Sequence, residues 1–335
     1  MKILITTGLL ETDIGGPSQY ASKLRDEFQV LGHDVKIVSY GSVERSLFIG
    51  LRHIYFFLRI IPKCLWADCI LTLDTFSVGL PSVLAASLFH KKVIVRAGGD
   101  FVWSAYVNRT DVPVKLSSFY KSLPNLDRKE RLIFFLTKFL TKRASFFAFN
   151  TKWQERIWSD YYKIENSRSG VVRNFIPEKK HDKRYSTKNF LWAGRLIPEK
   201  NIELLEKAVS HVKTRYPEFR LDIVTDRSHQ NVLDMIKESY AVISPAVSDI
   251  CPNFILEGIS FNKPFVMTQD TGLREICPKG GIFVDSLNEG ELEKAVEAVL
   301  DDNIYNKLRG ELEEVNLEHS WGDIADKYLN IWQSL

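Results

Sequence analysis

Short apolar runs alternate along the chain with longer segments in which apolar residues recur every three or four positions. The short runs are rich in β-branched and aromatic residues, as buried strands are, and the longer segments have the spacing of amphipathic helices. Strands that alternate with helices predict parallel sheets covered by helices on both faces, and therefore an α/β fold. We expect strands at residues 2–7, 35–40, 92–97, 145–150, 189–194, 221–225, 240–244 and 264–268.

These strands fall into two series, separated by a polar stretch at residues 177–188 with the composition of an exposed linker. A chain of 335 residues suits two domains. We therefore expect one domain at residues 1–180 and another at 186–318. Doubly wound sheets bind ligands beyond the carboxyl ends of their strands, so the site residues should follow strands.

Two segments of the first half mix basic and apolar residues. Residues 46–62 are strongly apolar, but Arg52, His53 and Arg59 interrupt a run already shorter than the roughly 20 residues that span a bilayer. Residues 128–143 have the same mixture. Either segment alone is equally well explained as a core helix with a basic outer face. Together they favour helices that lie on an anionic membrane surface.

Charge is distributed unevenly. Residues 1–185 hold 29 Lys/Arg and 17 Asp/Glu, a net +12, whereas residues 186–335 hold 16 and 25, a net −9. The basic half suits an anionic partner, although solubility alone would also explain it. No DNA- or RNA-binding motif accompanies the charge, so we expect no nucleic-acid partner.

The overall composition, with 45% apolar and 26% charged residues, is that of a packed globular protein. Its cysteines lack the CxxC and Cys/His spacings of zinc and redox sites. The chain passes from Met1 straight into a strand pattern, without the features of a secretory signal. We expect a cytoplasmic protein with buried thiols at Cys64, Cys69, Cys251 and Cys277.

Two features of the first half are candidates for ligand binding. Gly15 and Gly16 follow the first strand and precede Pro17, where a helix should begin, and such a loop allows close backbone approach to an anion. The spacing is not GxGxxG and no ribose-binding acid follows, so a nicotinamide enzyme is disfavoured and a tight turn is the alternative. Asp100 follows the strand at 92–97, after two glycines, and is a candidate active-site residue, although Gly-Gly-Asp is also common in turns.

In the second half, Gly194 and Arg195 end the strand at 189–194, and Lys200 precedes the next helix. Two cations beside a helix N-terminus would stabilise the negative charge that builds on a leaving diphosphate. Two ordinary surface cations are the alternative interpretation.

The strand at 240–244 is followed by Asp249 in a loop and by Glu257, eight residues later, in a helix. A loop carboxylate accepts hydrogen bonds from sugar hydroxyls, and a helical one can bind the two hydroxyls of a ribose. Free amides near Asn253, Phe254 and Ile255 can cap phosphates. A nucleotide sugar would use all three.

At these residues the chain resembles the retaining glycosyltransferases of family 4, which have the GT-B fold of two facing Rossmann-like domains. The resemblance implies that Arg195 and Lys200 bind the donor diphosphate, while Asp249 contacts the donor sugar and Glu257 the ribose. The matching pieces are the Gly15-Gly16-Pro17 loop, Gly194-Arg195 through Lys200-Asn201, the acidic pair, and residues 271–275.

The resemblance also implies a reaction. A hexose would pass from a nucleotide-diphosphate sugar to a glycan or lipid-linked acceptor in surface polysaccharide or glycolipid synthesis, with no metal and no other cofactor. The absence of a DxD motif agrees with this. Residues 319–335 resemble the terminal helix that crosses back to the first domain, with Trp321, Tyr328 and Trp332 as packing anchors. The acceptor would place the basic half at the inner face of the membrane.

Three departures from the family pattern affect the site. Asp249 replaces a glutamate and is one methylene shorter, and Ile250-Cys251 replaces a pair of small residues. The segment from Asp226 to Ser239 is short and lacks the usual glycine-rich turn and extra strand. The alternative hypothesis is therefore a catalytically degenerate relative that acts as a nucleotide-binding or scaffold module.

Overall fold

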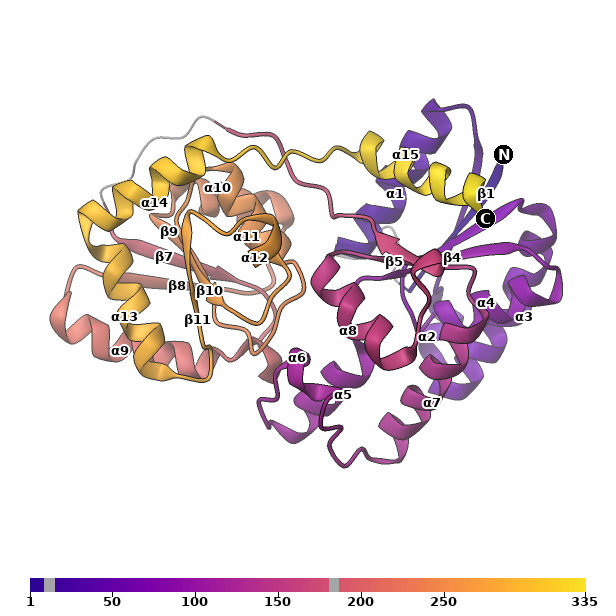
Figure 1. Ribbon diagram of the computed structural model, residues 1–335, viewed down its shortest axis with the longest axis horizontal. Coiled ribbons are helices and arrows are strands. Elements are labelled where there is room, and N and C mark those ends of the chain that lie inside the picture. Colours follow the sequence, from indigo (N-terminus) through magenta and orange to yellow (C-terminus); the bar gives the residue numbers. More distant parts are fainter. Residues whose placement is uncertain (9–15, 181–186) are drawn as a thin grey trace. The chain divides into compact units, whose positions relative to one another are not determined.

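The computed structural model describes residues 1–8, 16–180 and 187–335, which form two compact units (Figure 1). Unit 1 comprises Met1–Val102, Asn125–Arg173 and Ser320–Leu335. Unit 2 comprises Trp103–Pro124 and Asn174–His319. Residues 103–124 thus belong to unit 2, although they lie inside the first series of strands.

Unit 1 contains a six-stranded parallel sheet in the order β2-β1-β3-β4-β5-β6. Its strands are β1 (Lys2–Thr7), β2 (Asp34–Ser39), β3 (Cys69–Thr72), β4 (Lys92–Ala97), β5 (Phe146–Phe149) and β6 (Ser169–Val171). Its helices are α1 (Gly16–Val30), α2 (Ser42–Ser46), α3 (Ile49–Trp66), α4 (Gly79–Leu88), α7 (Arg128–Arg143), α8 (Lys152–Tyr162), the short η1 (Asn166–Arg168) and α15 (Trp321–Ser334). Helix α5 (Phe101–Thr110) begins in unit 1 and continues in unit 2.

Unit 2 contains a five-stranded parallel sheet in the order β11-β10-β9-β7-β8. Its strands are β7 (Asn189–Ala193), β8 (Arg220–Val224), β9 (Ala241–Ser244), β10 (Phe265–Thr268) and β11 (Gly281–Val284). Its helices are α6 (Leu116–Phe119), the short η2 (Pro198–Lys200), α9 (Ile202–Arg215), α10 (His229–Glu238), α11 (Asn253–Ser260), α12 (Leu273–Ile276), α13 (Glu289–Leu300) and α14 (Asp302–Glu314).

All the expected strands are present, with ends within one residue of the prediction, but the pattern missed β3, β6 and β11. Strand β3 is a buried four-residue run that follows an apolar helix, and periodicity does not separate such a run from a continuation of the helix. Strand β6 is short and contains Gly170. Strand β11 begins at Gly281, where a Cβ atom would lie 2.3 Å from the Phe265 ring, so close packing requires this strand-weakening residue.

The two basic and apolar segments of the first half are helical. Helix α7 has the expected range, and Asp127 caps it by accepting from the Glu130 amide. Helix α3 continues past Pro62 to Trp66. Pro62 lies on the exposed side, so water can satisfy the carbonyl that it frees. No helix among the described residues is long and apolar enough to cross a bilayer.

The C-terminal helix α15 packs in unit 1 beside α1, as the resemblance implied (Figure 1). Tyr328 and Trp332 are buried in the core that contains Ile3 and Phe28, and the Trp332 ring lies 5.7 Å from that of Phe28. The Tyr328 and Tyr20 hydroxyls are 3.2 Å apart. The last helix therefore completes the core of the first unit.

Truncating Trp332 to alanine should cost about 3–5 kcal/mol of unfolding free energy, because a large buried ring would leave a cavity between α15 and α1. Urea denaturation of Trp332→Ala, followed by circular dichroism, measures the loss. The matched control is Gln333→Ala, whose side chain is exposed on the same helix. Equal stability of the two variants would contradict the packing role of α15.

Candidate active site

The strand order of unit 2 places a topological switch point between β7 and β9. From β7 the chain goes to β8 on one side, whereas β9, β10 and β11 follow on the other. Ligands of open parallel sheets bind beyond the carboxyl ends of the strands at such a point. The loop after β7 carries Arg195 and Lys200, and the loop after β9 carries Asp249. The structure thus brings these three candidates to one position of the sheet.

The loop after β7 is held by backbone and side-chain hydrogen bonds. Gly194 N donates to Val224 O of β8. Asn201 has a left-handed backbone with φ 54°, a conformation that asparagine tolerates better than most residues. Its Nδ2 donates to Pro245 O at 3.3 Å and to Ser286 O at 2.6 Å. This short turn, η2, is therefore fixed to the loops that follow β9 and β11.

Lys200 and Asp249 form an ion pair, with Lys200 Nζ 3.0 Å from Asp249 Oδ2. Their side chains are 26% and 15% exposed, so the pair is partly shielded from water yet reachable by a ligand. The Asp249 carboxylate raises the pKa of Lys200, against the opposing effects of burial and of the Arg195 charge. Lys200 therefore stays cationic, beside an exposed Arg195.

The Asp249 loop is supported by the loop after β10. Asp249 N donates to Asp270 O at 3.1 Å, and Gly272 N donates to Ile250 O at 3.0 Å. Ser248 Oγ donates to the Asp270 carboxylate. The buried loop that carries the acid is thus built into the sheet edge, with Cys251 as one of four buried, free thiols.

Helix α11 begins at Asn253, and its N-cap residue is Pro252, which has no side-chain oxygen to cap the helix. Asn253 is exposed and Phe254 half-buried, whereas Ile255 is buried. Asn174 Nδ2 donates to Asn253 Oδ1 at 2.9 Å and so orients the first residue. The expectation of a free amide at Ile255 is wrong, because Ile255 N donates to Pro252 O at 3.1 Å. The amides of Asn253 and Phe254, with the positive end of the helix dipole, suit a phosphate.

Glu257 lies on α11, and His229 of α10 lies against it, with His229 Nε2 2.7 Å from Glu257 Oε1. This hydrogen bond raises the pKa of His229, and burial opposes it less strongly. The acid that the resemblance assigns to the ribose is therefore paired with an imidazole. The sequence analysis did not identify His229.

The first-half candidates lie in unit 1 and have other surroundings. Asp100 is buried; its Oδ1 accepts from Val102 N and its Oδ2 from Trp158 Nε1. Its carboxylate thus holds the start of α5, and its catalytic role stays a prediction. Gly16 is the first residue of α1, and Gly15 lies outside the described residues.

Asp74, which the sequence analysis missed, follows β3 at the switch point of the unit 1 sheet between β1 and β3. Burial raises its pKa to about 6 even though backbone hydrogen bonds lower it. Its Oδ1 accepts from the amides of Phe76, Val78 and Gly79, so the carboxylate caps the start of α4. Asp74 thus has a clear structural role.

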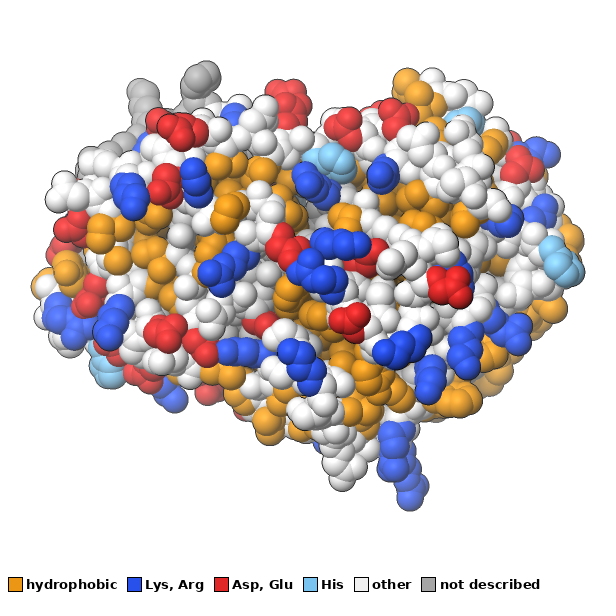
Figure 2. All heavy atoms as spheres, in the orientation of Figure 1, with side chains coloured by type: hydrophobic (Ala, Val, Ile, Leu, Met, Phe, Trp, Pro, Cys, Tyr) orange, Lys and Arg blue, Asp and Glu red, His pale blue; other side chains and the backbone are white. Residues whose placement is uncertain are grey.

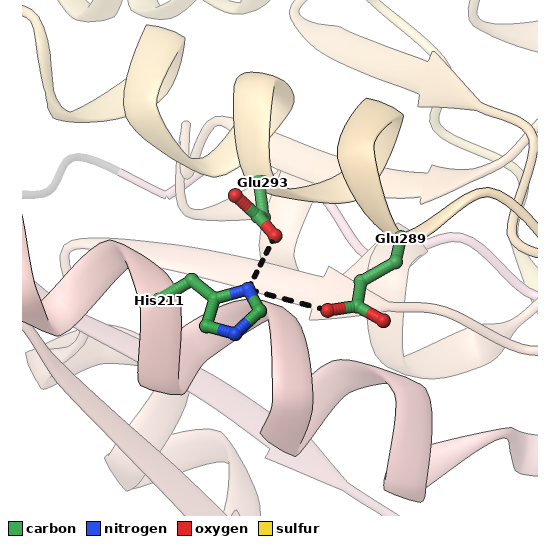
Figure 3. Close-up of side chains that lie close together, drawn as sticks. All are labelled: His211, Glu289 and Glu293. Carbon is green, nitrogen blue, oxygen red and sulfur yellow. Dashed lines mark hydrogen bonds and ion pairs between the residues drawn. The ribbon is translucent and has the colours of Figure 1, made fainter.

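One His and acidic cluster in the described part of the chain has the spacing of a metal site (Figure 3). His211 Nδ1 lies 3.3 Å from Glu289 Oε1 and 2.8 Å from Glu293 Oε1. Arg215 Nη2 lies 3.1 Å from Glu293 Oε2, and Arg215 Nε also pairs with Glu297. Because the Arg215 guanidinium already pairs with Glu293, the cluster is an ion-pair network that joins α9 to α13.

No protein-family model matches the chain. The gpi3 subunit of phosphatidylinositol N-acetylglucosaminyltransferase from Schizosaccharomyces pombe is 22% identical over an alignment of 195 residues, which covers 49% of this chain and 42% of that protein. The chain thus spans less than half the length of this curated relative.

Solved structures resemble the whole chain. Sucrose-phosphate synthase from Thermosynechococcus elongatus has a TM-score of 0.74 at 11% identity and covers 99% of this chain and 98% of its own. The fold is GT-B. HepE from Anabaena, solved with UDP, has a TM-score of 0.69 at 12% identity over the whole of both chains. The expected architecture of two Rossmann-like GT-B domains is therefore confirmed.

The His229–Glu257 pair predicts a pH dependence. The pKa of His229 should exceed 6.5. The pair with Glu257 should then stabilise the folded state below pH 6.5, and this stabilisation should be lost as the pH rises through the raised pKa. An NMR titration of the His229 ring in the free protein measures this pKa. Glu257→Gln should move the pKa of His229 back towards 6.5. Glu238→Gln changes an exposed acid on α10, the helix of His229, and should leave that pKa unchanged. A wild-type pKa at or below 6.5 would contradict the pairing.

Proposed function

We propose that this protein is a glycosyltransferase that takes its sugar from a nucleotide-diphosphate donor bound by unit 2. The observation that carries the proposal is the Lys200–Asp249 pair at the β7/β9 switch point. A second cation, Arg195, lies beside it, and the N-terminus of α11 begins four residues after Asp249. Phosphate-binding groups and a sugar-binding acid are thus combined where open α/β sheets bind ligands.

In the proposed reaction, the bond between the anomeric carbon and the diphosphate oxygen breaks, and the acceptor oxygen forms a bond to the same carbon. Arg195 and Lys200 stabilise the charge that develops on the leaving diphosphate. Asp249 accepts hydrogen bonds from the sugar, and Glu257 from the ribose. With retention of configuration, the leaving phosphate helps to deprotonate the acceptor, and neither a protein nucleophile nor a metal is required.

The relatives support a choice of substrates. HepE structures contain UDP and UDP-glucose, and the gpi3 subunit belongs to an N-acetylglucosaminyltransferase that acts on phosphatidylinositol. We therefore favour a uridine-diphosphate hexose as donor and a lipid-linked or glycan acceptor. A nucleotide-binding module without turnover is the second candidate. It is favoured by the sheet of five strands, in which the segment before β9 adds no extra strand, and by Asp249, which is one methylene shorter than the glutamate of the family pattern.

Lys200→Ala should lower donor turnover by about 100-fold or more, because a charge that stabilises the leaving group is lost. The measurement is release of the nucleoside diphosphate: UDP from UDP-glucose and UDP-N-acetylglucosamine, and GDP or ADP from the corresponding GDP- and ADP-sugars. Lys213→Ala, an exposed lysine of α9, is the matched control. Full activity of Lys200→Ala would contradict the proposed site, and wild-type binding without turnover would favour the nucleotide-binding module.

We further propose that α3 and α7 contact an anionic membrane. Helix α4 packs against both helices. The exposed apolar side chains along α3 include Leu51, Ile54 and Leu58, and Phe48, which is 84% exposed, precedes them. Helix α7 exposes Phe135 among lysines and arginines, and Figure 2 has basic and apolar side chains intermingled around the α7 side of unit 1. Exposed apolar groups flanked by cations suit a lipid interface.

Vesicles of phosphatidylglycerol and phosphatidylcholine should sediment the wild-type protein at low salt, whereas vesicles of phosphatidylcholine alone should not. The double variant Leu58→Ser and Phe135→Ser should lose most of the binding, because it removes apolar area from both helices. Ile304→Ser, an exposed apolar residue of unit 2, is the control. Failure of the wild-type protein to sediment would show that both helices have only a structural role.

A further inference from the structure

Residues 103–124 contact the loops that follow β7, β9 and β11 of unit 2. Leu116 N donates to Ser248 Oγ at 2.8 Å, next to Asp249. Lys115 Nζ lies 2.6 Å from Asp285 Oδ2, after β11. Within the segment, Trp103 Nε1 donates to Val114 O at 2.7 Å and so ties its helix to its loop. The segment therefore lies along the carboxyl edge of the sheet, where the proposed donor site is found.

The most extensive contact is a cluster of hydrogen bonds around Glu199. Ser104 Oγ donates to Glu199 Oε2 at 2.5 Å, and Asn108 Nδ2 donates to the same oxygen at 3.1 Å. Asn108 Oδ1 accepts from Glu199 N at 3.2 Å. One asparagine thus binds both the carboxylate and the backbone amide of Glu199, and all three side chains are half-buried.

Glu199 is the residue before Lys200 and belongs to the same turn, η2. Its backbone oxygen also accepts from Val247 N at 2.9 Å, in the Asp249 loop. With its side chain, amide and carbonyl all bonded, Glu199 has little freedom to rotate. Because Lys200 follows directly, the direction in which its side chain leaves the backbone is set by the same contacts.

We propose that Asn108, assisted by Ser104, is a positioning residue that holds the Glu199–Lys200 turn so that the Lys200 ammonium meets the donor diphosphate. The inference rests on the proposed function, because Lys200 has to contact the donor. Asn108 itself contacts Glu199 and acts on the ligand only through Lys200. Part of the donor site is thus supplied by a segment from the first half of the sequence.

The test is the dissociation constant for UDP, with GDP and ADP in parallel, measured by titration calorimetry on the full chain. Asn108→Ala should weaken binding about tenfold, because it removes two hydrogen bonds to a charged residue and its backbone. In a Lys200→Ala background the same change should have no further effect, because the group that Asn108 positions is gone. Arg109→Ala, an exposed neighbour on α5, should bind as the wild type does.

A reciprocal exchange separates positioning from folding. In Asn108→Asp a carboxylate faces Glu199, so binding should be weaker than in Asn108→Ala. Adding Glu199→Gln provides an amide that can donate to the new carboxylate, and binding should return to within about threefold of the wild type. Thermal unfolding of each variant, compared with that of Arg109→Ala, reports whether the fold is retained.

The outcomes distinguish the two proposals. If the wild-type protein binds none of the nucleoside diphosphates, the proposed function fails and this inference fails with it. If the wild-type protein binds and Lys200→Ala weakens binding, the function stands. Two results would then overturn the positioning role alone. Asn108→Ala would have no effect on binding, or the same effect in the wild type and in Lys200→Ala, and Asn108→Asp with Glu199→Gln would not restore binding.

Discussion

The ion pair between Lys200 and Asp249 joins two loops that leave neighbouring strands of one sheet, and it holds the two charged groups of the candidate site together. Each charge is partly buried, so removing either one would leave the other without its partner in a poorly solvated position. A phosphate or a sugar hydroxyl that enters here meets groups that are already oriented. The positive charge that the proposed diphosphate donor requires is therefore present in the free protein.

The backbone explains why this pair forms between residues 49 positions apart. Parallel pairing of β7 with β9 brings their carboxyl ends together. The chain leaves β7 towards β8 on one side and β9 towards β10 on the other, so the two loops diverge and leave a space between them at the switch point. Asn201, with its left-handed φ, ends η2 and starts α9, which turns Lys200 towards Asp249. Local turn chemistry and sheet topology thus fix one contact together.

The sequence alone was sufficient for the α/β class, for the main strands and for the position of Arg195, Lys200 and Asp249 after strands, because these follow from the hydrophobic pattern. Strand β3 was missed because four buried residues carry no period of their own, and β11 because it is equally short and begins with a glycine. His229 was missed for a different reason. It begins an exposed helix, and only the packing of α10 against α11 brings it to Glu257.

The place of residues 103–124 could not be predicted from any local pattern. Their helix starts directly after β4, and Asp100 caps it within unit 1, so continuity along the chain favours the first domain. What decides otherwise is a set of polar contacts to Glu199, Ser248 and Asp285, each more than 90 positions away. Such contacts have no periodicity and no composition signature. Unit 2 is therefore discontinuous in sequence, and residues that affect its proposed donor site should be sought in both halves of the chain.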